Sequence, residues 1–306
     1  MEVLIIGLGS IAAKHIIALK AIDKDVKIYA LRSGKGNDTE GIINIYDLSE
    51  LISKPRFVII SNPTQLHQQS ILFVIKLGVP LFIEKPPLHT LSGAQEIVEQ
   101  INQHNIFTYV ACNLRFHPCI QFLKDHLKNN NRHINEVNVY CGSYLPDWRP
   151  GKDYKTAYSA NKDLGGGVHL DLFHETDYTC WLFGYPGTSR GFISNKSSLK
   201  IDAADYANYL LEYPGFNASI ILNYYRKSPK RTIDILFDTE SWTVDLISNT
   251  IVADSNKLIF QSPDFKIIDT YINQMRYFVD YQEAKKIPMN TFEEAIETLK
   301  ISLKNE

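Results

Sequence analysis

The sequence has few cysteines, and their spacing matches no common metal site or disulfide framework. Four occur among 306 residues, at positions 112, 119, 141 and 180, and no two of them form a CxxC pair. This spacing excludes a zinc knuckle and a small, disulfide-rich secreted domain. We therefore expect reduced, mostly buried thiols in a cytoplasmic protein.

The sequence also lacks a basic excess and a long apolar run. Its 32 Lys and Arg residues are balanced by 34 Asp and Glu residues, which gives a net charge of −2. No stretch approaches the roughly 20 apolar residues of a membrane span, and Glu2 and early glycines argue against a signal peptide. We expect no nucleic-acid partner and no membrane partner. A hydrophobic content of 44% allows a packed core, and the length suits two domains.

Short apolar runs alternate with amphipathic segments in the first part of the chain. This rhythm predicts an α/β domain with a parallel sheet covered on both faces. The predicted strands are 3–6, 26–31, 56–61, 80–84 and 106–112, and the predicted helices are 11–22, 66–78 (with Gly78 as C-cap) and 93–104.

After about residue 117 the rhythm changes to strands in quick succession, which predicts an α+β domain with a large, mostly antiparallel sheet. We place the boundary between residues 1–117 and 118–306. The predicted strands are 136–144, 188–194, 204–213, 217–225, 231–238, 241–247 and 249–253, and two helical stretches near 267–285 and 291–304 close the chain.

The glycine-rich segment "GLGSIA" follows the first predicted strand and opens the first predicted helix. Gly7 permits a tight turn, Gly9 lets a pyrophosphate approach the backbone, and the third position needs only a small residue. The start of the helix, at Ser10 and Ile11, offers free N–H groups to phosphates. The segment therefore predicts dinucleotide binding; the alternative is a glycine turn without a ligand.

The end of the second strand indicates which dinucleotide binds. NAD sites usually place an acid there for the ribose 2′-hydroxyl, but this strand ends in Arg32 and Ser33, and no acid follows until Asp38. Arg32 could pair with a 2′-phosphate or stack on adenine. We expect NADP more than NAD, although a solvated surface arginine is the alternative for Arg32.

The segment "EKPP" places Glu84 and Lys85 just past another apolar strand. Ligands of doubly wound sheets lie beyond the carboxyl ends of strands, and Pro86 and Pro87 stiffen this turn. A lysine in a partly dry cleft can lose its proton more readily or hold an alkoxide by charge. The alternative is a surface salt pair.

A glycine triplet at 165–167 precedes a predicted continuous helix that ends at Gly184. On such a helix Asp171, His174 and Tyr178 share one face. His174 can take or return a hydroxyl proton, and Asp171 or Asp177 can orient its ring. The triplet would let the backbone pass close to a cofactor or to the first domain.

Two other interpretations of this helix compete with a catalytic one. His169 and His174 are five residues apart, too far around the helix to share one ion, and HExxH is absent, so we expect no metal. A merely solvated helix face is the second alternative.

Other polar residues are candidates for contacts with the substrate. Arg115 could grip a phosphate or carboxylate, and an intramolecular acid partner is equally plausible. In the polar loop 145–163, Trp148 or Tyr154 could pack on a sugar face, while Arg149 and Lys152 could bind an anionic group. His15 and His67 suit packing or capping better than catalysis, although His67 could approach the cofactor ribose.

Four motifs occur in the order found in one enzyme family. With "GLGSIA", "SNPTQLH" (61–67), "EKPP" and the triplet followed by HxxD, the chain resembles the Gfo/Idh/MocA family of glucose-fructose oxidoreductase-like and inositol dehydrogenase-like enzymes. The resemblance implies a Rossmann domain, a second domain with a large open sheet, a nicotinamide cofactor and a sugar-like or polyol substrate. It implies that Lys85 lies beside the nicotinamide and that the cofactor site includes Asn62, Pro63, His67 and Glu84. It also implies a homodimer or homotetramer built through the open sheet.

The chain departs from the family pattern at one place. The family helix usually carries DxxxHxxD, whereas "DLFH" is one residue shorter, so His174 and Asp177 match and Asp171 matches less securely. The segment "YLPDWRPGKDY" (144–154) resembles a loop of a surface-sugar biosynthesis branch, which hints at a nucleotide sugar or an acidic sugar. We expect an NAD(P)-dependent oxidoreductase acting on CH–OH groups, with Lys85 and His174 sharing the proton chemistry. The alternatives are a non-catalytic NADP-binding sensor or partner protein, and a non-redox, glycosidase-like enzyme with tightly held NAD.

Overall fold

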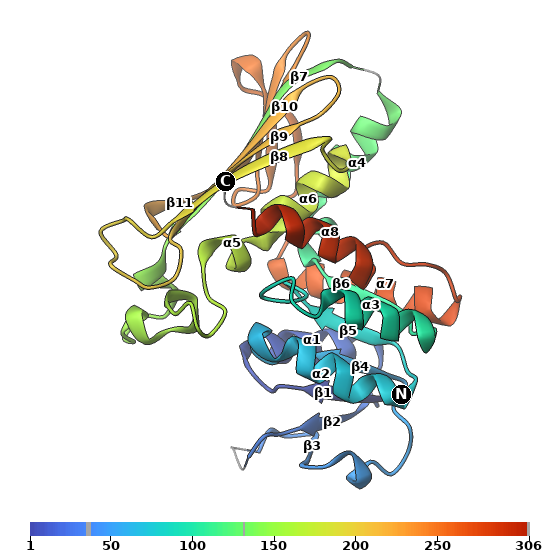
Figure 1. Ribbon diagram of the computed structural model, residues 1–306. Helices are drawn as coiled ribbons and strands as arrows, with labels where there is room; N and C mark the ends of the chain where they lie inside the picture. Colours follow the sequence, from blue (N-terminus) through green and yellow to red (C-terminus); the bar gives the residue numbers. More distant parts are fainter. Residues whose placement is uncertain (35–37, 131, 305–306) are drawn as a thin grey trace. The chain divides into compact units, whose positions relative to one another are not determined.

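The computed structural model describes residues 1–34, 38–130 and 132–304, and the chain forms two compact units (Figure 1). Unit 1 comprises Met1–Asn113 and Ile267–Glu297, and unit 2 comprises Leu114–Lys266 and Thr298–Glu306. This division differs from the expected 1–117 and 118–306 because helix α7 (Ile267–Glu283) belongs to unit 1. Its apolar stripe, including Met275 and Phe278, joins the core of the first sheet.

Unit 1 contains sheet A, whose six strands are all parallel in the order β3-β2-β1-β4-β5-β6. The predicted parallel sheet is confirmed, and strand β3 at its edge was missed because its side chains are only partly buried. The strands are β1 (Glu2–Ile6), β2 (Lys27–Leu31), β3 (Ile42–Ile45), β4 (Phe57–Ile60), β5 (Leu81–Glu84) and β6 (Thr108–Ala111).

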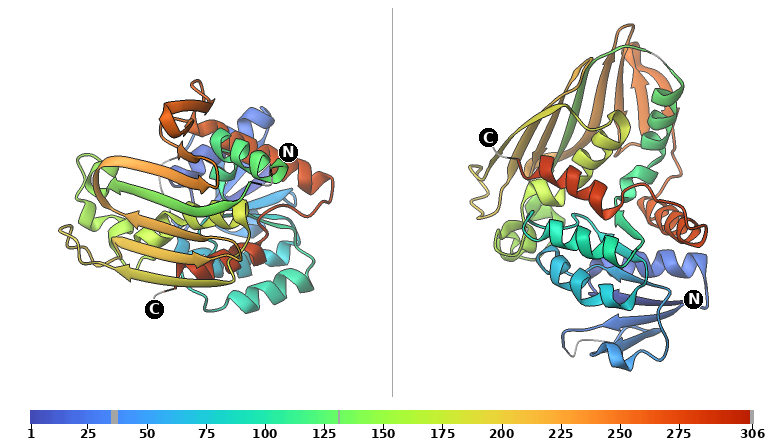
Figure 2. Two further views of the ribbon diagram at one scale, coloured as in Figure 1. Left: turned by 90° about the horizontal axis from the view of Figure 1, so that it is seen from above. Right: turned by 45° about the vertical axis from the view of Figure 1, so that its right-hand side comes forward.

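Helices cover both faces of sheet A (Figure 2). Helix α1 (Ser10–Ile22) packs with α7 on one face, and α2 (His67–Val74) and α3 (Ala94–Gln103) cover the other. Gly78 adopts the left-handed conformation expected of a C-cap, after a short 3-10 turn, η3 (Ile75–Leu77). Chain order reverses between β1 and β4, and this reversal opens a crevice at the carboxyl ends of these strands.

Unit 2 contains sheet B, with eight strands in the order β14-β13-β12-β11-β7-β10-β9-β8. Only β10 and β7 pair in parallel, so the predicted mostly antiparallel sheet is confirmed. The strands are β7 (Ile134–Tyr144), β8 (Thr188–Ser194), β9 (Tyr206–Glu212), β10 (Asn217–Asn223), β11 (Tyr225–Phe237), β12 (Ser241–Asp245), β13 (Thr250–Ala253) and β14 (Lys257–Gln261).

Helices α4 (Pro118–Asn129) and α6 (Phe173–Phe183) pack on one face of sheet B, and a helix pair closes the chain, with α8 (Phe292–Ser302) after α7. The other face of sheet B keeps large apolar side chains exposed, among them Phe192 on β8 and Leu210 on β9. Sheet B is thus an open sheet with one covered face.

The expectation of one continuous helix after the glycine triplet is wrong. The chain forms α5 (Val168–Asp171), leaves helical geometry at Leu172 (φ −95°, ψ 36°) and resumes as α6. Asp171 and His174 therefore lie on two different helices, and Tyr178 is fully buried. The predicted shared face of these three residues does not exist, because the break changes the direction of the side chains that precede it.

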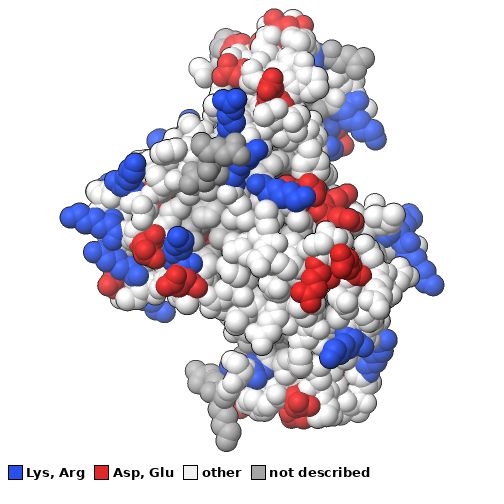
Figure 3. Space-filling view, viewed as in Figure 1, with Lys and Arg blue, Asp and Glu red and all other residues white. Residues whose placement is uncertain are grey.

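The surface carries charged side chains of both signs. Lys, Arg, Asp and Glu are interspersed over the face drawn in Figure 3. Within the described ranges, no helix has the length and apolar character needed to cross a membrane.

Candidate cofactor and substrate sites

The glycine loop between β1 and α1 packs directly against the turn that follows β4. Gly7 has a φ of +89°, and a Cβ atom there would lie 2.5 Å from the backbone N and Cα of Asn62. Only glycine allows both this conformation and this contact. At Gly9, by contrast, a Cβ atom would meet no protein atom within 4 Å. The open space above Gly9, beside the free N–H groups of α1, is where a phosphate group would fit.

A cavity of about 430 Å³ lies at this carboxyl edge of sheet A. It brings together five of the residues predicted to bind the cofactor, namely Gly7, Arg32, Ser33, Asn62 and Pro63. Gly9, Ser10 and Ile11 lie at the start of α1, and Glu84, Lys85 and His67 are not among the residues that line the cavity. The predicted cofactor residues thus form one group around a cavity and a second group outside it.

Sequence reasoning missed the apolar walls of this cavity. Tyr46, Leu66 and Phe73 line it and are 48%, 39% and 48% exposed. Flat, exposed apolar surfaces of this kind suit a purine or nicotinamide ring. Tyr46 directly follows β3, so recognising that strand would have placed Tyr46 at the ligand edge of the sheet.

Arg32 and Ser33 line the cavity at the end of β2, as expected for a cofactor-selecting position. The Arg32 guanidinium donates to Asn44 Oδ1 (3.2 Å), and Asn44 in turn donates to Asp38 (2.8 Å). Asp38 does not line the cavity, and among the described lining residues none is an acid. No carboxylate in this set is therefore placed to bind a ribose 2′-hydroxyl.

The residues of the cavity fit a nicotinamide dinucleotide. Asn62 donates from Nδ2 to Ser70 Oγ (2.8 Å), while its Oδ1 is buried and has no hydrogen-bond partner among the described residues. A buried amide oxygen without a donor costs free energy that a ligand N–H or O–H would recover. This orphaned acceptor, the open Gly9 backbone and the cationic Arg32 are the features that such a ligand requires.

Three predicted residues surround the turn after β5. Lys85 is half-buried and is followed by a cis peptide bond to Pro86. Glu84 and His67 are 6% and 1% exposed, and both bond to protein groups instead of lining the cavity. The structure therefore gives Glu84 and His67 contacts with the turn itself, which is the packing role that we considered for His67.

In unit 2, the acids around His174 have partners of their own. The Tyr224 hydroxyl donates to Asp171 Oδ2, and His174, on α6, is half-buried. Asp177 accepts from Arg115 Nε (3.0 Å) and Nη2 (2.7 Å), and this pair is almost fully buried. Arg115 thus has the intramolecular acid partner that was the alternative to a ligand phosphate. Both Asp177 oxygens face Arg115, which leaves Asp171 as the acid of this helix pair with partial exposure.

A second ion pair, in which only the carboxylate is fully buried, anchors α6 to sheet B, and sequence reasoning missed it. Arg231 on β11 donates from Nε to Glu175 Oε1 (2.6 Å), and Glu175 has no exposed surface. Burial raises the pKa of the neighbouring Tyr178 well above its ordinary value, with Glu175 adding to the effect. No periodic signal distinguishes Glu175 in the sequence, because its partner is 56 residues away.

The polar loop after β7 folds around a cavity of about 190 Å³. Trp148, Arg149 and Tyr154, all predicted to contact substrate, line it together with Lys152. Trp148 donates to Ser143 Oγ and packs edge-on against the Tyr224 ring, with centroids 5.3 Å apart. Tyr224 therefore links the aromatic wall of this loop to Asp171, although Asp171 and His174 do not line the cavity.

The central glycine of the triplet packs closely on backbone atoms of the preceding loop. A Cβ atom at Gly166 would lie 2.1 Å from the carbonyl oxygen of Tyr158 and 2.8 Å from that of Asn161, and the Gly166 N–H donates to Asn161. The close approach of Gly166 is to the polar loop of unit 2 itself, and passage of the triplet beside a cofactor stays a prediction.

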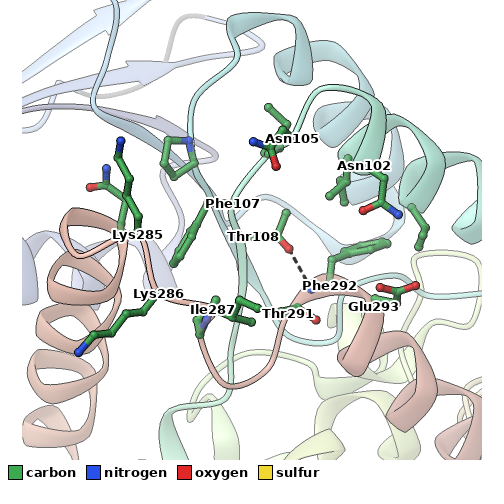
Figure 4. Close-up of a pocket in the computed structure, with 16 residues that line it drawn as sticks. Asn102, Asn105, Phe107, Thr108, Lys285, Lys286, Ile287, Thr291, Phe292 and Glu293 are labelled. Atoms are coloured by element: carbon green, nitrogen blue, oxygen red, sulfur yellow. Dashed lines mark hydrogen bonds between the residues drawn. The ribbon is translucent and has the colours of Figure 1, made fainter.

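Another cavity of unit 1, about 470 Å³, lies at the opposite edge of sheet A (Figure 4). Phe107 directly precedes β6, and Thr108 is its first residue. The connection between α7 and α8 closes the cavity, with the Phe292 N–H donating to Thr108 Oγ1 (3.1 Å). None of the predicted site residues lines it. Because ligands of doubly wound sheets bind at the carboxyl edge, we assign the cofactor to the smaller cavity.

The sequence predicted reduced, mostly buried cysteines and no metal site. All four cysteines are free and buried, as predicted. Burial raises the pKa of Cys119 and of Cys180 to about 12, so both remain thiols. Within residues 1–34, 38–130 and 132–304, no group of three or more His, Cys, Asp or Glu side chains is placed to hold a metal ion.

Known proteins resemble the chain in sequence and in fold. The family model described as oxidoreductase family, NAD-binding Rossmann fold, matches residues 1–111. The 4-carboxy-2-hydroxymuconate-6-semialdehyde dehydrogenase of Sphingobium sp. (strain NBRC 103272 / SYK-6) is 24% identical over 194 residues, which are 60% of this chain and 58% of that protein. The chain thus matches less than two thirds of this relative's length.

Two solved structures share the fold over nearly the whole chain. UDP-N-acetylglucosamine 3-dehydrogenase GnnA from Acidithiobacillus ferrooxidans has a TM-score of 0.79 at 18% identity, and the alignment covers 99% of this chain and 95% of that one. Levoglucosan dehydrogenase, in complex with NADH and levoglucosan, has a TM-score of 0.85 at 16% identity, with coverage of 99% and 95%. The expected combination of a Rossmann domain and an open-sheet domain is confirmed. Residues 1–111, which carry the glycine loop, the Asn62 turn and Lys85, match the model of the Gfo/Idh/MocA oxidoreductase family.

Proposed function

We propose that this chain is a nicotinamide-dependent oxidoreductase that oxidises or reduces a CH–OH group of a sugar, a sugar derivative or a nucleotide sugar. The observation that carries the proposal is the cavity at the carboxyl edge of sheet A, where Gly7, Arg32 and Asn62 meet. The family match and the printed activities of GnnA and levoglucosan dehydrogenase support it. Unit 1 then serves the cofactor, and unit 2 serves the substrate.

We infer NADP as the preferred cofactor. Arg32 and Ser33 offer a cation and a hydroxyl where NAD enzymes usually place an acid. A 2′-phosphate would gain a charge-assisted contact with Arg32, whereas a 2′-hydroxyl would find no carboxylate among the described lining residues. The matched family is described as NAD-binding, so the preference is a property proposed for this chain.

Each candidate side chain has a distinct task in this proposal. A bound nicotinamide would accept or supply the hydride. Lys85 would stabilise the developing alkoxide by charge, and His174 would take or return the hydroxyl proton, since imidazole titrates near neutral pH. Asp171 would hold the substrate or orient His174, and it is itself held by Tyr224. Because Asp177 is paired with Arg115, we infer that it anchors α6 and has no direct role in proton transfer.

The loop cavity of unit 2 supplies candidate substrate contacts. Trp148 and Tyr154 offer ring faces, and Arg149 and Lys152 offer cations. Ring faces pack on the apolar side of a pyranose, and the two cations suit a carboxylate or phosphate. This combination favours a sugar that carries an anionic group.

A substrate panel tests the activity directly. Purified protein is mixed with polyols, sugars, sugar acids and nucleotide sugars, each with NADP and with NAD, and turnover is followed by nicotinamide absorbance. We expect turnover of at least one member, with NADP preferred. Once a substrate is known, Lys85→Met and His174→Ala should each reduce kcat about 100-fold. Intact turnover in both variants would overturn the assigned roles.

We also propose that the open face of sheet B forms a homodimer or homotetramer in the cytoplasm. Phe192 and Leu210 project from this face, 51% and 59% exposed, and the four free thiols suit a reducing compartment. Light scattering on the purified chain tests the assembly, with Leu210→Glu expected to lower the mass and Ile52→Glu, at an exposed site in unit 1, as its control. An unchanged mass in Leu210→Glu would refute the assignment of this face.

A further inference from the structure

The turn that carries Lys85 is connected to the glycine-loop helix through a buried carboxylate. His15, on α1, places Nε2 2.6 Å from Glu84 Oε1, and the other carboxylate oxygen of Glu84 accepts the backbone N–H of Lys85 (3.1 Å). His15 has no exposed surface, and Glu84 is 6% exposed. The Glu84 carboxylate therefore joins α1, which the glycine loop opens, to the backbone of Lys85.

A second buried histidine holds the same turn from the other side. His67 Nδ1 lies 3.1 Å from the Pro86 carbonyl oxygen and 3.2 Å from that of Pro87, and Nε2 lies 3.0 Å from the carbonyl oxygen of Asn62. All three partners are acceptors, so His67 is the donor. His67 thus connects the Lys85 turn to Asn62, a residue that lines the cofactor cavity.

Neither histidine lines the cofactor cavity, and neither has surface to offer a ligand. Burial lowers the pKa of His67, so its ring is neutral and carries one N–H. We assign this N–H to Nδ1, which faces the carbonyl groups of Pro86 and Pro87. In His15, Nδ1 is buried without a hydrogen-bond partner among the described residues, so Nε2 carries the ring's hydrogen bond, the one to Glu84. Both side chains act on the turn and not on a bound molecule.

We propose that His15 and His67 are positioning residues that fix the backbone of Lys85 relative to the glycine loop and the Asn62 turn, His15 through Glu84 and His67 through the carbonyl groups of Pro86 and Pro87. The proposal rests on the proposed function in one respect, namely that Lys85 takes part in the chemistry. A lysine side chain has several rotatable bonds, so a fixed backbone limits where its amine can reach. A displacement of about 1 Å can reduce a rate about 100-fold.

The chemistry of each ring gives matched variants. A glutamine amide nitrogen can replace Nε2 of histidine, and an asparagine amide nitrogen can replace Nδ1. His15→Gln should keep the bond to Glu84, and His15→Leu should remove it. His67→Asn should keep the donor toward Pro86 and Pro87, and His67→Gln should keep only the one toward Asn62. His104→Gln, at an exposed histidine of unit 1, is the control.

Acetylation of lysine, quantified by mass spectrometry, provides a readout that needs no substrate. The rate at Lys85 is divided by the rate at Lys24, an exposed lysine of the same unit. Since a released turn opens more often, we expect this ratio to rise about threefold or more in His15→Leu and His67→Gln. It should stay near the wild-type ratio in His15→Gln, His67→Asn and His104→Gln.

Turnover provides the second readout, using the substrate found in the panel. We expect kcat to fall about tenfold or more in His15→Leu and His67→Gln while the Kd for NADP stays within a factor of about two. If His15→Leu does not fold, Glu84→Gln is measured instead, because it weakens the same contact in a side chain of the same shape. Equal acetylation ratios within each pair would overturn the proposal even if the enzyme is active. If no substrate is turned over, the proposed function fails, and the acetylation ratios still decide the positioning role.

Discussion

The Tyr224 hydroxyl donates a hydrogen bond to the carboxylate of Asp171, across 53 residues of sequence. Tyr224 follows β10 and is fully buried, and the Trp148 ring packs edge-on against it. Burial, and then the Asp171 charge, raise the pKa of Tyr224 well above its ordinary value, so the hydroxyl remains a donor throughout the physiological range. Asp171 is thereby held as an acceptor, despite the shortened spacing that made it a doubtful site residue.

Tyr224→Phe should test this contact without changing the shape of the core. The variant removes a donor from a partly buried carboxylate, so we expect the free energy of unfolding to fall by about 1.5–3 kcal/mol and kcat/KM to fall about tenfold. Urea unfolding and steady-state kinetics measure the two effects. Tyr213→Phe, which loses a bond to the Gly184 carbonyl, is the control and should keep its activity. Equal activity of the two variants would contradict a role for Tyr224 in the substrate site.

Gly7→Ala and Gly9→Ala should separate a structural glycine from a ligand-binding one. At Gly7 a Cβ atom would meet the Asn62 backbone at 2.5 Å with φ at +89°, so the ligand-free protein should lose stability or fail to fold. At Gly9 the space is open, so Gly9→Ala should melt like the wild type and bind NADPH about tenfold more weakly or worse. Thermal melting and fluorescence titration measure the difference. Wild-type affinity in Gly9→Ala would place the phosphates elsewhere.

Arg32→Ala should reduce NADPH affinity selectively. Loss of a charge-assisted contact to the 2′-phosphate is expected to raise the Kd for NADPH about tenfold or more, while the Kd for NADH changes little. Fluorescence titration with both cofactors measures this. Arg56→Ala, which removes an arginine paired with Glu283 outside the cavity, is the control. A parallel loss of both affinities would mean that Arg32 does not select the cofactor.

Asp177→Asn should be far more costly than Glu240→Gln. Asp177 forms a buried pair with Arg115, and removing its charge leaves that arginine buried without a counter-charge, at a cost of about 3–5 kcal/mol. Glu240 pairs with Arg132 at a more exposed site, where solvent screens the interaction, and its loss should be small by comparison. Urea unfolding of both variants decides this, and similar stabilities would argue against Arg115–Asp177 as an anchor of α6.

Protonation of His117 should lower the free energy of unfolding in acid. Its Nδ1 accepts from the Cys119 N–H at the start of α4, its Nε2 donates to Asn249, and burial lowers the pKa of His117 to about 4. Because the folded-state pKa lies below the unfolded value of about 6.5, the stability is fully present above that value and is lost as the pH falls toward 4. The loss should reach about 1.4 kcal/mol per pH unit.

His117→Asn retains a capping oxygen but cannot titrate. Urea unfolding at about pH 7 and about pH 5 should therefore show a smaller acid loss in this variant than in the wild type. His169, whose pKa burial also lowers to about 4, contributes a background loss that both proteins share. An identical pH dependence in the two proteins would exclude His117 as the source.

The sequence predicted most of unit 1 because its signals are local. Apolar runs that alternate with amphipathic segments specify buried parallel strands and covering helices, and a glycine loop between the first strand and helix specifies the ligand edge. Gly7, Arg32, Ser33, Asn62 and Pro63 were therefore predicted to lie near one another, and they line one cavity. The edge strand β3 escaped because half-buried side chains weaken the apolar signal.

The sequence by itself determined the fold class, because the order of strands, helices and glycine turns can be predicted from local patterns of residues. Tertiary structure decided which polar groups meet. It paired Arg115 with Asp177 and Tyr224 with Asp171. It interrupted the helix at Leu172, and it brought His15 within hydrogen-bond distance of Glu84. These partners lie 53 to 69 residues apart in the sequence, and no period encodes such pairs because each depends on how distant elements pack. The roles of these residues therefore became arguable only once their contacts were known.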